Sequence, residues 1–402
     1  MRRHLKPTHE SSLIFILAAC SAVSSMATNL VLPALPEIRS HFHASIAAVQ
    51  SMLSVYMIAF ACSILVVGPL SDRWGRRPVL IGGMLIFAFG SLLAVAAPSL
   101  PVLVFARVVQ ALGAATGLVI ARAVVGDLYE GAGLTQRLAT LAMVAVAATS
   151  ASPYVGGLVT VMGGWYGPLV LLTGIPLALA LVCSRYLPET CDTLHRGLPV
   201  SAIWARSRAM LTDSHFLICV LQTGVIFSIF SVIITGTPYL LADVMHRSPT
   251  DFGLFYLLIT VGYFFGNMKV SRSAHVLNGE RTTAVGLWVQ LGGSVVALSF
   301  ALAGLVHPLW LFGPMLPMAF GQGIAMPTTT AKAISLAPGF SGIATSLLVF
   351  GQQFMGALSV QGMGWAASDS AVPILIFCTV ASIAALLPVL ISRPLERPFS
   401  RL

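Results

Sequence analysis

The sequence predicts an all-α integral membrane protein with twelve transmembrane helices in two six-helix bundles and with both termini in the cytoplasm. Three observations carry this prediction: the scarcity of charge, the length of the apolar runs, and the side on which the basic residues lie. Only 9% of the 402 residues are charged and 57% are hydrophobic, whereas a soluble domain has about 25% charged residues. So few charges cannot cover a water-facing surface, which excludes soluble enzymes and soluble nucleic-acid-binding proteins.

Twelve apolar runs are long enough to cross a bilayer, because a spanning helix needs about 20 mainly apolar residues. The runs are continuous, unlike the short alternating segments of a membrane β-barrel. The first run is too long, and its flank too rigid, for a cleaved signal peptide. The expected spans are 13–35, 49–70, 78–97, 100–121, 138–161, 164–186, 216–240, 253–268, 282–305, 308–327, 342–366 and 371–391.

The basic residues predict the orientation of these spans. Of the 22 Lys and Arg residues, 19 lie on the amino-terminal side of the expected membrane, and only Arg39 and Arg247 lie on the opposite side. The remaining one, Arg107, falls inside a span. Cytoplasmic loops carry an excess of Lys and Arg, so both termini are expected in the cytoplasm. The net charge of +9 therefore reflects topology and does not indicate a nucleic-acid partner.

A repeat divides the chain into halves. Six expected spans precede the one long polar stretch and six follow it, and Gly68 and Gly266, which close the second and eighth spans, are 198 residues apart. Such parallel repeats are typical of secondary transporters, whose substrate site lies near the bilayer midplane between the halves. We expect an N-terminal bundle over 1–187, a cytoplasmic connector over 188–213 and a C-terminal bundle over 214–402.

The segment between the second and third expected spans reads GPLSDRWGRRP, from Gly68 to Pro78. Asp72 is expected to break the helix and to be able to face the positive amino terminus of another helix. Gly75 permits a tight turn. The three arginines can pair with carboxylates or cap helix carbonyls. A basic loop that only sets topology is the alternative.

This segment resembles the loop signature G-x-L-x-D-R-x-G-R-R of the major facilitator superfamily. The resemblance implies the major facilitator fold and a latch, made by Asp72, Arg73 and Arg76, that holds the two bundles closed on the cytoplasmic side. The corresponding loop of the second half, 266–281, keeps only scattered matches. The predicted gating residues are Gly68, Asp72, Arg73, Gly75, Arg76 and Arg77.

Arg107 is expected about 10 Å inside the fourth span, where a charge is costly and usually faces the protein interior or a wet cavity. The stretch from Arg107 to Gly113 resembles the fourth-span motif R-x-x-Q-G-x-G of the superfamily, with Ala111 in place of its first glycine. The resemblance favours a role in coupling or substrate contact over a snorkelling or structural arginine. The predicted coupling and cavity residues are Arg107, Gln110, Asp127 and Asn29.

The fifth span contains SPYVGG, from Ser152 to Gly157. Pro153 removes a backbone hydrogen bond and bends the helix, and the pair Gly156 and Gly157 allows another helix to approach closely. Helix packing alone explains this pattern. The stretch also resembles the antiporter signature G-P-x-x-G-G, with Ser152 in place of glycine, which implies an antiporter-like helix bend.

Three further stretches resemble the bicyclomycin/chloramphenicol-resistance branch of drug:proton antiporters: 28–36, 187–190 and 338–346. The resemblance implies multidrug or antibiotic efflux from a bacterial inner membrane in exchange for protons. That branch usually carries Asp-Met-Tyr where this chain has Asn29-Leu30-Val31.

None of the 13 acidic residues and no histidine lies in the middle of an expected span. A proton-coupled carrier normally needs a titratable group in its cavity. We therefore expect Asp127, at the inner end of the fourth span, to take part, linked to Arg107 through the same helix. An acid that merely ends the helix is the alternative.

The positions of the charged residues also predict the class of substrate. A cavity that holds Arg107 and no carboxylate should repel lipophilic cations. Neutral, zwitterionic or anionic amphiphiles are favoured, with phenicol-like compounds as the example. Besides Asn29 and Gln110, the predicted cavity residues are Tyr56, Phe227, Gln322 and Gln353.

Enzyme signatures are absent from the sequence. No lysine follows a glycine, which excludes a Walker loop, and no zinc-protease or serine-hydrolase motif occurs. We expect a monomeric, proton-coupled exporter without enzymatic activity, cofactor, metal or nucleic-acid partner. The alternatives are a proton-independent facilitator or a sugar or amino-acid exporter of the same fold, and then a membrane enzyme or a structural membrane protein.

Overall fold

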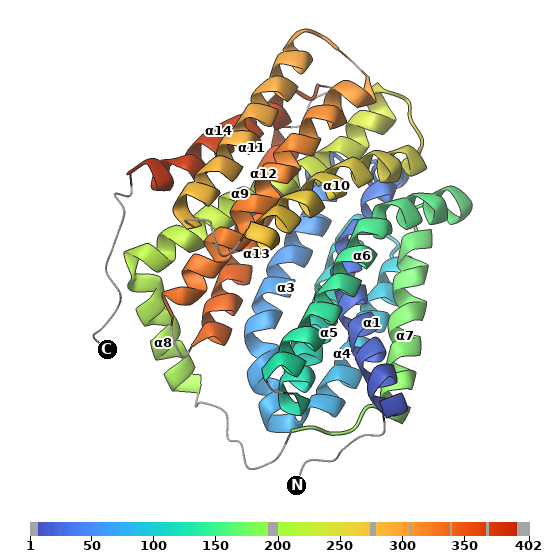
Figure 1. Cartoon of the computed structure of the whole chain (residues 1–402). Helices are drawn as coiled ribbons and strands as arrows, with labels where there is room; N and C mark the ends of the chain where they lie inside the picture. Colours follow the sequence, from blue (N-terminus) through green and yellow to red (C-terminus); the bar gives the residue numbers. More distant parts are fainter. Residues whose placement is uncertain are drawn as a thin grey trace. The chain divides into compact units, whose positions relative to one another are not determined.

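The computed structural model describes residues 7–129, 131–191, 200–273, 279–305, 307–337, 340–366 and 370–391. All secondary structure in these ranges is helical (Figure 1). Twelve of the described helical segments are long and apolar enough to cross a membrane. The predicted all-α class and the predicted number of spans are therefore confirmed.

The chain divides into two compact units, Met1–Val200 and Ser201–Leu402, and the boundary lies within the predicted connector 188–213. The connector also contains a helix, α8, that the sequence pattern does not predict. The spans of the first unit are formed by α1 (Pro7–Asn29), which η1 (Leu32–Ala34) and α2 (Leu35–His41) extend, and by α3 (Ile46–Trp74), α4 (Arg76–Val95), α5 (Leu100–Leu128), α6 (Gly131–Gly163) and α7 (Gly167–Tyr186).

Helix α5 occupies the centre of the first unit, where it packs against α1, α3 and α4, while α1 also packs against α6 and α4 against α7. Small residues make these approaches possible, as is common between membrane helices. At Gly113 of α5, a Cβ atom would overlap the backbone of Gly83 and Phe87 on α4. The close α4–α5 crossing fixes the side chains that α5 carries.

Helix α8 (Val200–Thr212) starts at the boundary between the units, and the second unit contains six spans. They are α9 (Ser214–Tyr239) with its π-helical extension η2 (Leu240–Val244), α10 (Pro249–Ser273), α11 (Gly279–Leu302), α12 (Pro308–Ser335), α13 (Ser341–Trp365) and α14 (Val372–Ile391). Helix α12 packs against α10 and α11, and α9 packs against α12, α13 and α14.

Several helices extend beyond the predicted apolar runs. Helix α3 continues to Trp74, so the prediction that Asp72 breaks the helix is wrong, and the break falls at Gly75, whose φ of 98° suits glycine. Helix α12 continues through Pro327 to Ser335. The ends of a helix depend on capping; at the start of α3, for example, the Ser45 hydroxyl accepts a hydrogen bond from Ala48 N at 3.2 Å. The length of an apolar run instead reflects only the thickness of the hydrocarbon layer, so a helix can extend beyond its run.

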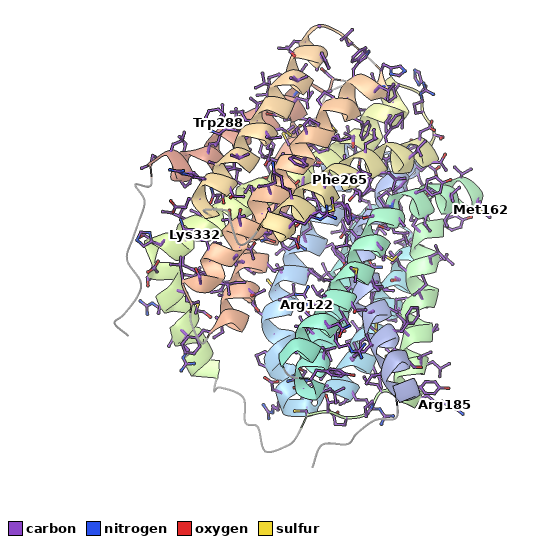
Figure 2. All side chains as sticks on the ribbon, viewed as in Figure 1. Arg122, Met162, Arg185, Phe265, Trp288 and Lys332 are labelled. Carbon is purple, nitrogen blue, oxygen red and sulfur yellow. The ribbon has the colours of Figure 1, made fainter. Side chains whose placement is uncertain are left out.

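Large apolar side chains lie on the surface of both units, among them Met162 (86% exposed), Trp288 and Phe265. Figure 2 shows Met162 and Arg185 at opposite ends of the first unit. Exposed apolar surface on this scale is unfavourable in water and suits contact with lipid.

Candidate functional site

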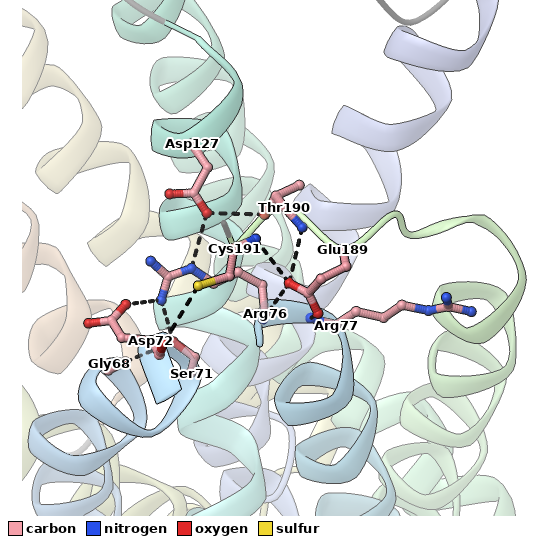
Figure 3. Close-up of polar contacts among 9 residues, drawn as sticks. All are labelled: Gly68, Ser71, Asp72, Arg76, Arg77, Asp127, Glu189, Thr190 and Cys191. Carbon is pink, nitrogen blue, oxygen red and sulfur yellow. Dashed lines mark hydrogen bonds and ion pairs between the residues drawn. The ribbon is translucent and has the colours of Figure 1, made fainter. Parts of the chain in front are cut away.

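Two polar clusters occur in the first unit. The first, called the turn network here, surrounds the α3–α4 turn and is drawn in Figure 3. Arg76 is at its centre, with a side chain that is 13% exposed. It forms an ion pair with Asp72, one helical turn earlier, and its Nε donates to Asp127 Oδ2 at 3.1 Å. Its Nη1 also donates to Ser71 Oγ at 2.5 Å. One guanidinium thus joins α3, α4 and α5 through charge-assisted hydrogen bonds.

Glu189, which follows α7, completes the turn network from a distant part of the chain. Its Oε1 accepts from Arg76 N at 2.9 Å and its Oε2 from Arg77 N at 3.2 Å. These are the first amides of α4, where the helix dipole favours an anion. Asp72 was expected to be able to face the amino terminus of another helix, but it pairs with Arg76 instead. Glu189 is the acid that lies at the amino terminus of α4.

The residues next to Glu189 bind the same network. Thr190 Oγ1 donates to Asp127 Oδ2 at 3.0 Å. Desolvation raises the pKa of the Cys191 thiol, so the thiol stays protonated and donates to the carbonyl oxygen of Asp72 at 3.6 Å. The segment that leaves α7 is thereby fastened to the α3–α4 turn.

The other predicted gating residues have different surroundings. Arg77 Nη2 donates to the carbonyl oxygen of Ser184 at 2.5 Å, close to the end of α7. Gly68 contributes its carbonyl oxygen, which accepts from Ser71 Oγ at 2.8 Å. Arg73 is exposed. All of these contacts lie inside the first unit, and a latch between bundles stays a prediction.

Gly75→Ala should destabilise the first unit by about 1–3 kcal/mol, because φ at this position is 98° with ψ at 150°, a region that nearly only glycine adopts. An added Cβ would also lie 2.5 Å from Glu189 Oε2. Gly68→Ala is the matched control in the same motif. No atom lies within 4 Å of a Cβ at Gly68, and Ala favours the helix by up to about 1 kcal/mol. Thermal unfolding in detergent measures both, and equal midpoints for the two variants would contradict this description of the turn.

The second polar cluster, called the arginine cluster here, lies inside the first unit. Arg107 of α5 is completely buried. Its Nη1 donates to Gln110 Oε1 on the same helix and, at 3.3 Å, to the carbonyl oxygen of Ala27 on α1. Its Cζ lies 4.2 Å from the ring centroid of Tyr56 on α3, a cation–π distance. Gln110 Nε2 donates to Ser91 Oγ on α4 at 2.6 Å. Four helices therefore hold this one cation.

No carboxylate in the described part of the chain pairs with Arg107, and its Nε and Nη2 have no hydrogen-bond partner. The hydroxyl of Tyr56, 2% exposed, also lacks one. Burying a cation without an anion costs several kcal/mol, and charged residues kept inside a membrane span usually serve a function. The free donors of Arg107 and Tyr56 can bind a carbonyl, a hydroxyl or an anionic oxygen.

The arginine cluster and the turn network are separate, although α5 carries a member of each. Arg107 and Asp127 are 20 residues apart on α5, which is about 30 Å along the helix axis. Asp127 bonds to Arg76 and Thr190 and has no bond to Arg107. Asn29, the last residue of α1, is buried two residues beyond Ala27.

The predicted helix bend lies where α6 meets the end of α1. Helix α6 runs through Pro153 as a single helix. A Cβ at Gly156 would overlap the carbonyl oxygen of Leu30, so this glycine permits the close approach, and Gly157 beside it is buried. The packing interpretation of this stretch has direct structural support, and its relation to antiport stays a prediction.

The predicted cavity residues of the second unit are Phe227 on α9, Gln322 on α12 and Gln353 on α13. Gln322 lines a small, partly open pocket together with Phe230, whose ring centroid is 6.3 Å from that of Phe227. Gln353 is half-buried and has no hydrogen bond to Gln322. The cavity has a further polar residue, Gln290 of α11. A glutamine inside the apolar run 282–305 was the available sequence signal for it.

Twelve helices long and apolar enough to span a membrane, with a fully buried arginine among four helices of the first unit, are the features of a membrane transporter. The family profile of the Major Facilitator Superfamily matches residues 17–360, and the chain belongs to this superfamily. It is thus a multi-pass membrane protein of a transporter family, as the loop signature implied.

Two relatives illustrate the sequence similarity. The chain is 28% identical over 378 residues to multidrug resistance protein D of Escherichia coli (strain K12), covering 91% of this chain and 90% of the relative. It is 25% identical to a chloramphenicol resistance protein of Pseudomonas aeruginosa, covering 93% and 89%. Among solved structures, a D-xylose-proton symporter matches with a TM-score of 0.74 at 14% identity, over 94% of this chain and 97% of that one. At this identity the structure supports the fold alone.

Proposed function

We propose that the chain is a secondary active multidrug or antibiotic efflux transporter that exports small neutral or zwitterionic amphiphiles, such as phenicols, in exchange for protons by alternating access. The names of the two relatives, a multidrug resistance protein and a chloramphenicol resistance protein, support this proposal. The observation that carries the substrate class is Arg107, fully buried with only neutral partners in the described part of the molecule.

The electrostatics of the arginine cluster support the proposed selectivity. Two like charges a few ångströms apart in a medium of reduced dielectric repel by several kcal/mol. An uncompensated guanidinium at Arg107 therefore disfavours a permanent cation nearby. A carbonyl, hydroxyl or nitro oxygen would instead accept a hydrogen bond from Nε or Nη2, which have no partner in the structure.

Proton coupling is proposed at the turn network. Asp127 and Asp72 both bind Arg76, and their side chains are 27% and 36% exposed, so water can deliver protons to them. Protonation would remove a carboxylate from Arg76 and weaken the joint between α3, α4 and α5. The residues that latch the bundles in this proposal are Asp72, Arg73 and Arg76, and the network would lie on the cytoplasmic side of a bacterial inner membrane with both termini on that side.

A proton-independent facilitator or metabolite exporter of the same fold is the second candidate. This candidate is favoured by the position of Asp72 and Asp127. Both carboxylates lie in the turn network and not beside Arg107, where a proton-coupled carrier would normally have a titratable group.

Expression in an efflux-deficient bacterial host tests the substrate class. Chloramphenicol should be exported with at least about a tenfold preference over ethidium or tetraphenylphosphonium, because a substrate that approaches the fixed charge of Arg107 as a cation is penalised by more than about 1.4 kcal/mol. Accumulation of each compound in the cells is the measurement, with the empty vector as control. Strong export of the quaternary cations would contradict the proposal.

A further inference from the structure

Gln290 in the middle of α11 has a buried amide that the protein does not satisfy. The residue is 1% exposed, and neither its Oε1 nor its Nε2 has a hydrogen-bond partner among the residues that the structure describes. The large majority of buried side-chain amides in proteins are hydrogen-bonded, because an unpaired amide is costly in an apolar interior. An amide in this state can gain two hydrogen bonds from a ligand group or a water that reaches it.

The amide of Gln290 lines a small, partly open pocket of about 10 Å³ within the second unit, about the space of one water, so a larger group requires the walls to move. The walls come from α9, α10, α11 and α12 and are apolar except for Gln290 and Gln322. Gln322 Nε2 has only a 3.4 Å bond, to the carbonyl oxygen of Ile226, which is long for this type of bond. Two glutamine amides with spare hydrogen-bonding capacity therefore share one cavity.

The backbone at Gln290 is fixed by a tight crossing of α11 and α12. A Cβ at Gly321 of α12 would lie 2.6 Å from Gln290 N, and a Cβ at Gly286 of α11 would lie 2.7 Å from the carbonyl oxygen of Gly321. Contact this close holds the side chain at the cavity. The neighbouring walls can adapt, because Met315 and Met318 line the same cavity and thioether side chains are flexible.

The first unit shows how such an amide is satisfied within the protein. Gln110 also lies at a glycine crossing, since a Cβ at Gly90 would overlap Gln110 N. There the Oε1 accepts from Arg107 and the Nε2 donates to Ser91. Gln290 has a similar setting without the two partners, which distinguishes it from a structural glutamine.

We propose that Gln290 and Gln322 form a subsite that binds the uncharged amide group of a substrate, one that offers a donor and an acceptor side by side, as a primary amide or a lactam does. The proposal rests on the proposed transport function and narrows its substrate class. A glutamine amide is complementary to such a group through two hydrogen bonds. A charged group would remain unpaired in this cavity, which has no charged wall residue.

Binding of two matched ligands to the purified full chain in detergent tests the subsite. The probes are para-butylbenzamide and para-butylacetophenone, which differ only in an amide NH₂ replaced by a methyl group. The wild type should bind the benzamide at least about fivefold more tightly, as expected for one to two hydrogen bonds. Gln290→Leu should reduce this preference to less than about twofold and should leave the melting temperature unchanged or raised, because it removes an unpaired buried amide.

Gln222→Leu is the control in the same unit. Gln222 is also buried, but its Nε2 donates to the carbonyl oxygen of Ala385 at 2.8 Å. This variant should lower the melting temperature and keep the ligand preference. The proposal is overturned if the wild type does not discriminate between the probes, a result that needs no variant, or if Gln290→Leu keeps the preference. Failure of phenicol export with an intact benzamide preference would contradict the proposed function and support the subsite.

Discussion

Arg107→Ala should reduce phenicol export by at least about tenfold, which corresponds to about 1.4 kcal/mol of lost transition-state stabilisation. The change removes the cation that four helices surround and leaves Gln110 Oε1 and the Ala27 carbonyl oxygen without their donor. Arg107→Lys should recover only part of the activity, because an ammonium has the charge but not the planar set of donors. Initial rates of export, normalised to the amount of protein in the membrane, are the measurement.

Arg122→Ala is the matched control for Arg107, because Arg122 lies on the same helix and is exposed. Its export rate should stay within about twofold of the wild type, as is usual for surface substitutions. If Arg107→Ala exported phenicols at a wild-type rate, the arginine cluster would be structural and the proposed substrate class would lose its basis.

Asp127→Asn should abolish transport driven by a proton gradient while it preserves exchange of labelled for unlabelled substrate without a gradient. An amide cannot take up a proton and mimics the protonated carboxyl. Its oxygen still accepts from Arg76 Nε and Thr190 Oγ1, although more weakly than a carboxylate, so the turn network stays assembled but no longer responds to protons. The comparison of gradient-driven efflux with exchange separates a coupling defect from a general loss of activity.

Asp251→Asn is the control for Asp127, since Asp251 lies in the first turn of α10, where it accepts a hydrogen bond from Ser248 N. It should keep both gradient-driven efflux and exchange. Proton-driven transport that survives Asp127→Asn would remove Asp127 from the coupling mechanism and favour a different titratable group or a proton-independent carrier.

The sequence is sufficient to predict the spans and the superfamily, because both depend on local features. A run of apolar residues predicts a spanning helix whatever surrounds it, and the loop around Asp72 and Gly75 is contiguous in the chain. The burial of Arg107 is predictable for the same reason, since its depth follows from its position in the run.

Contacts between distant segments are not predictable in this way. Glu189 is 113 residues from Arg76 along the chain, and no spacing rule links it to the first amides of α4. That Asp127 bonds to Arg76 and Thr190 depends on which segments pack against the end of α5, and no local pattern predicts these partners. Gln290 is visible as a polar residue in an apolar run, but its lack of partners depends on how α9, α11 and α12 pack.

The two polar clusters of the first unit suggest how a proton and a substrate interact in the proposed mechanism. Helix α5 carries Arg107 in its first third and Asp127 at its end, and it packs against α1, α3 and α4. A change in the charge at Asp127 would alter the joint at Arg76, and α5 itself would transmit the displacement to the arginine cluster. Coupling in this scheme requires no acid beside Arg107.

Purified protein in sealed vesicles with an imposed pH gradient gives the most direct test of proton-driven phenicol export. Addition of chloramphenicol should dissipate the gradient, as reported by a pH-sensitive dye, and vesicles with the Asp127→Asn variant should keep it. Chloramphenicol flux across the vesicle membrane without any movement of protons would contradict antiport and identify the chain as a facilitator.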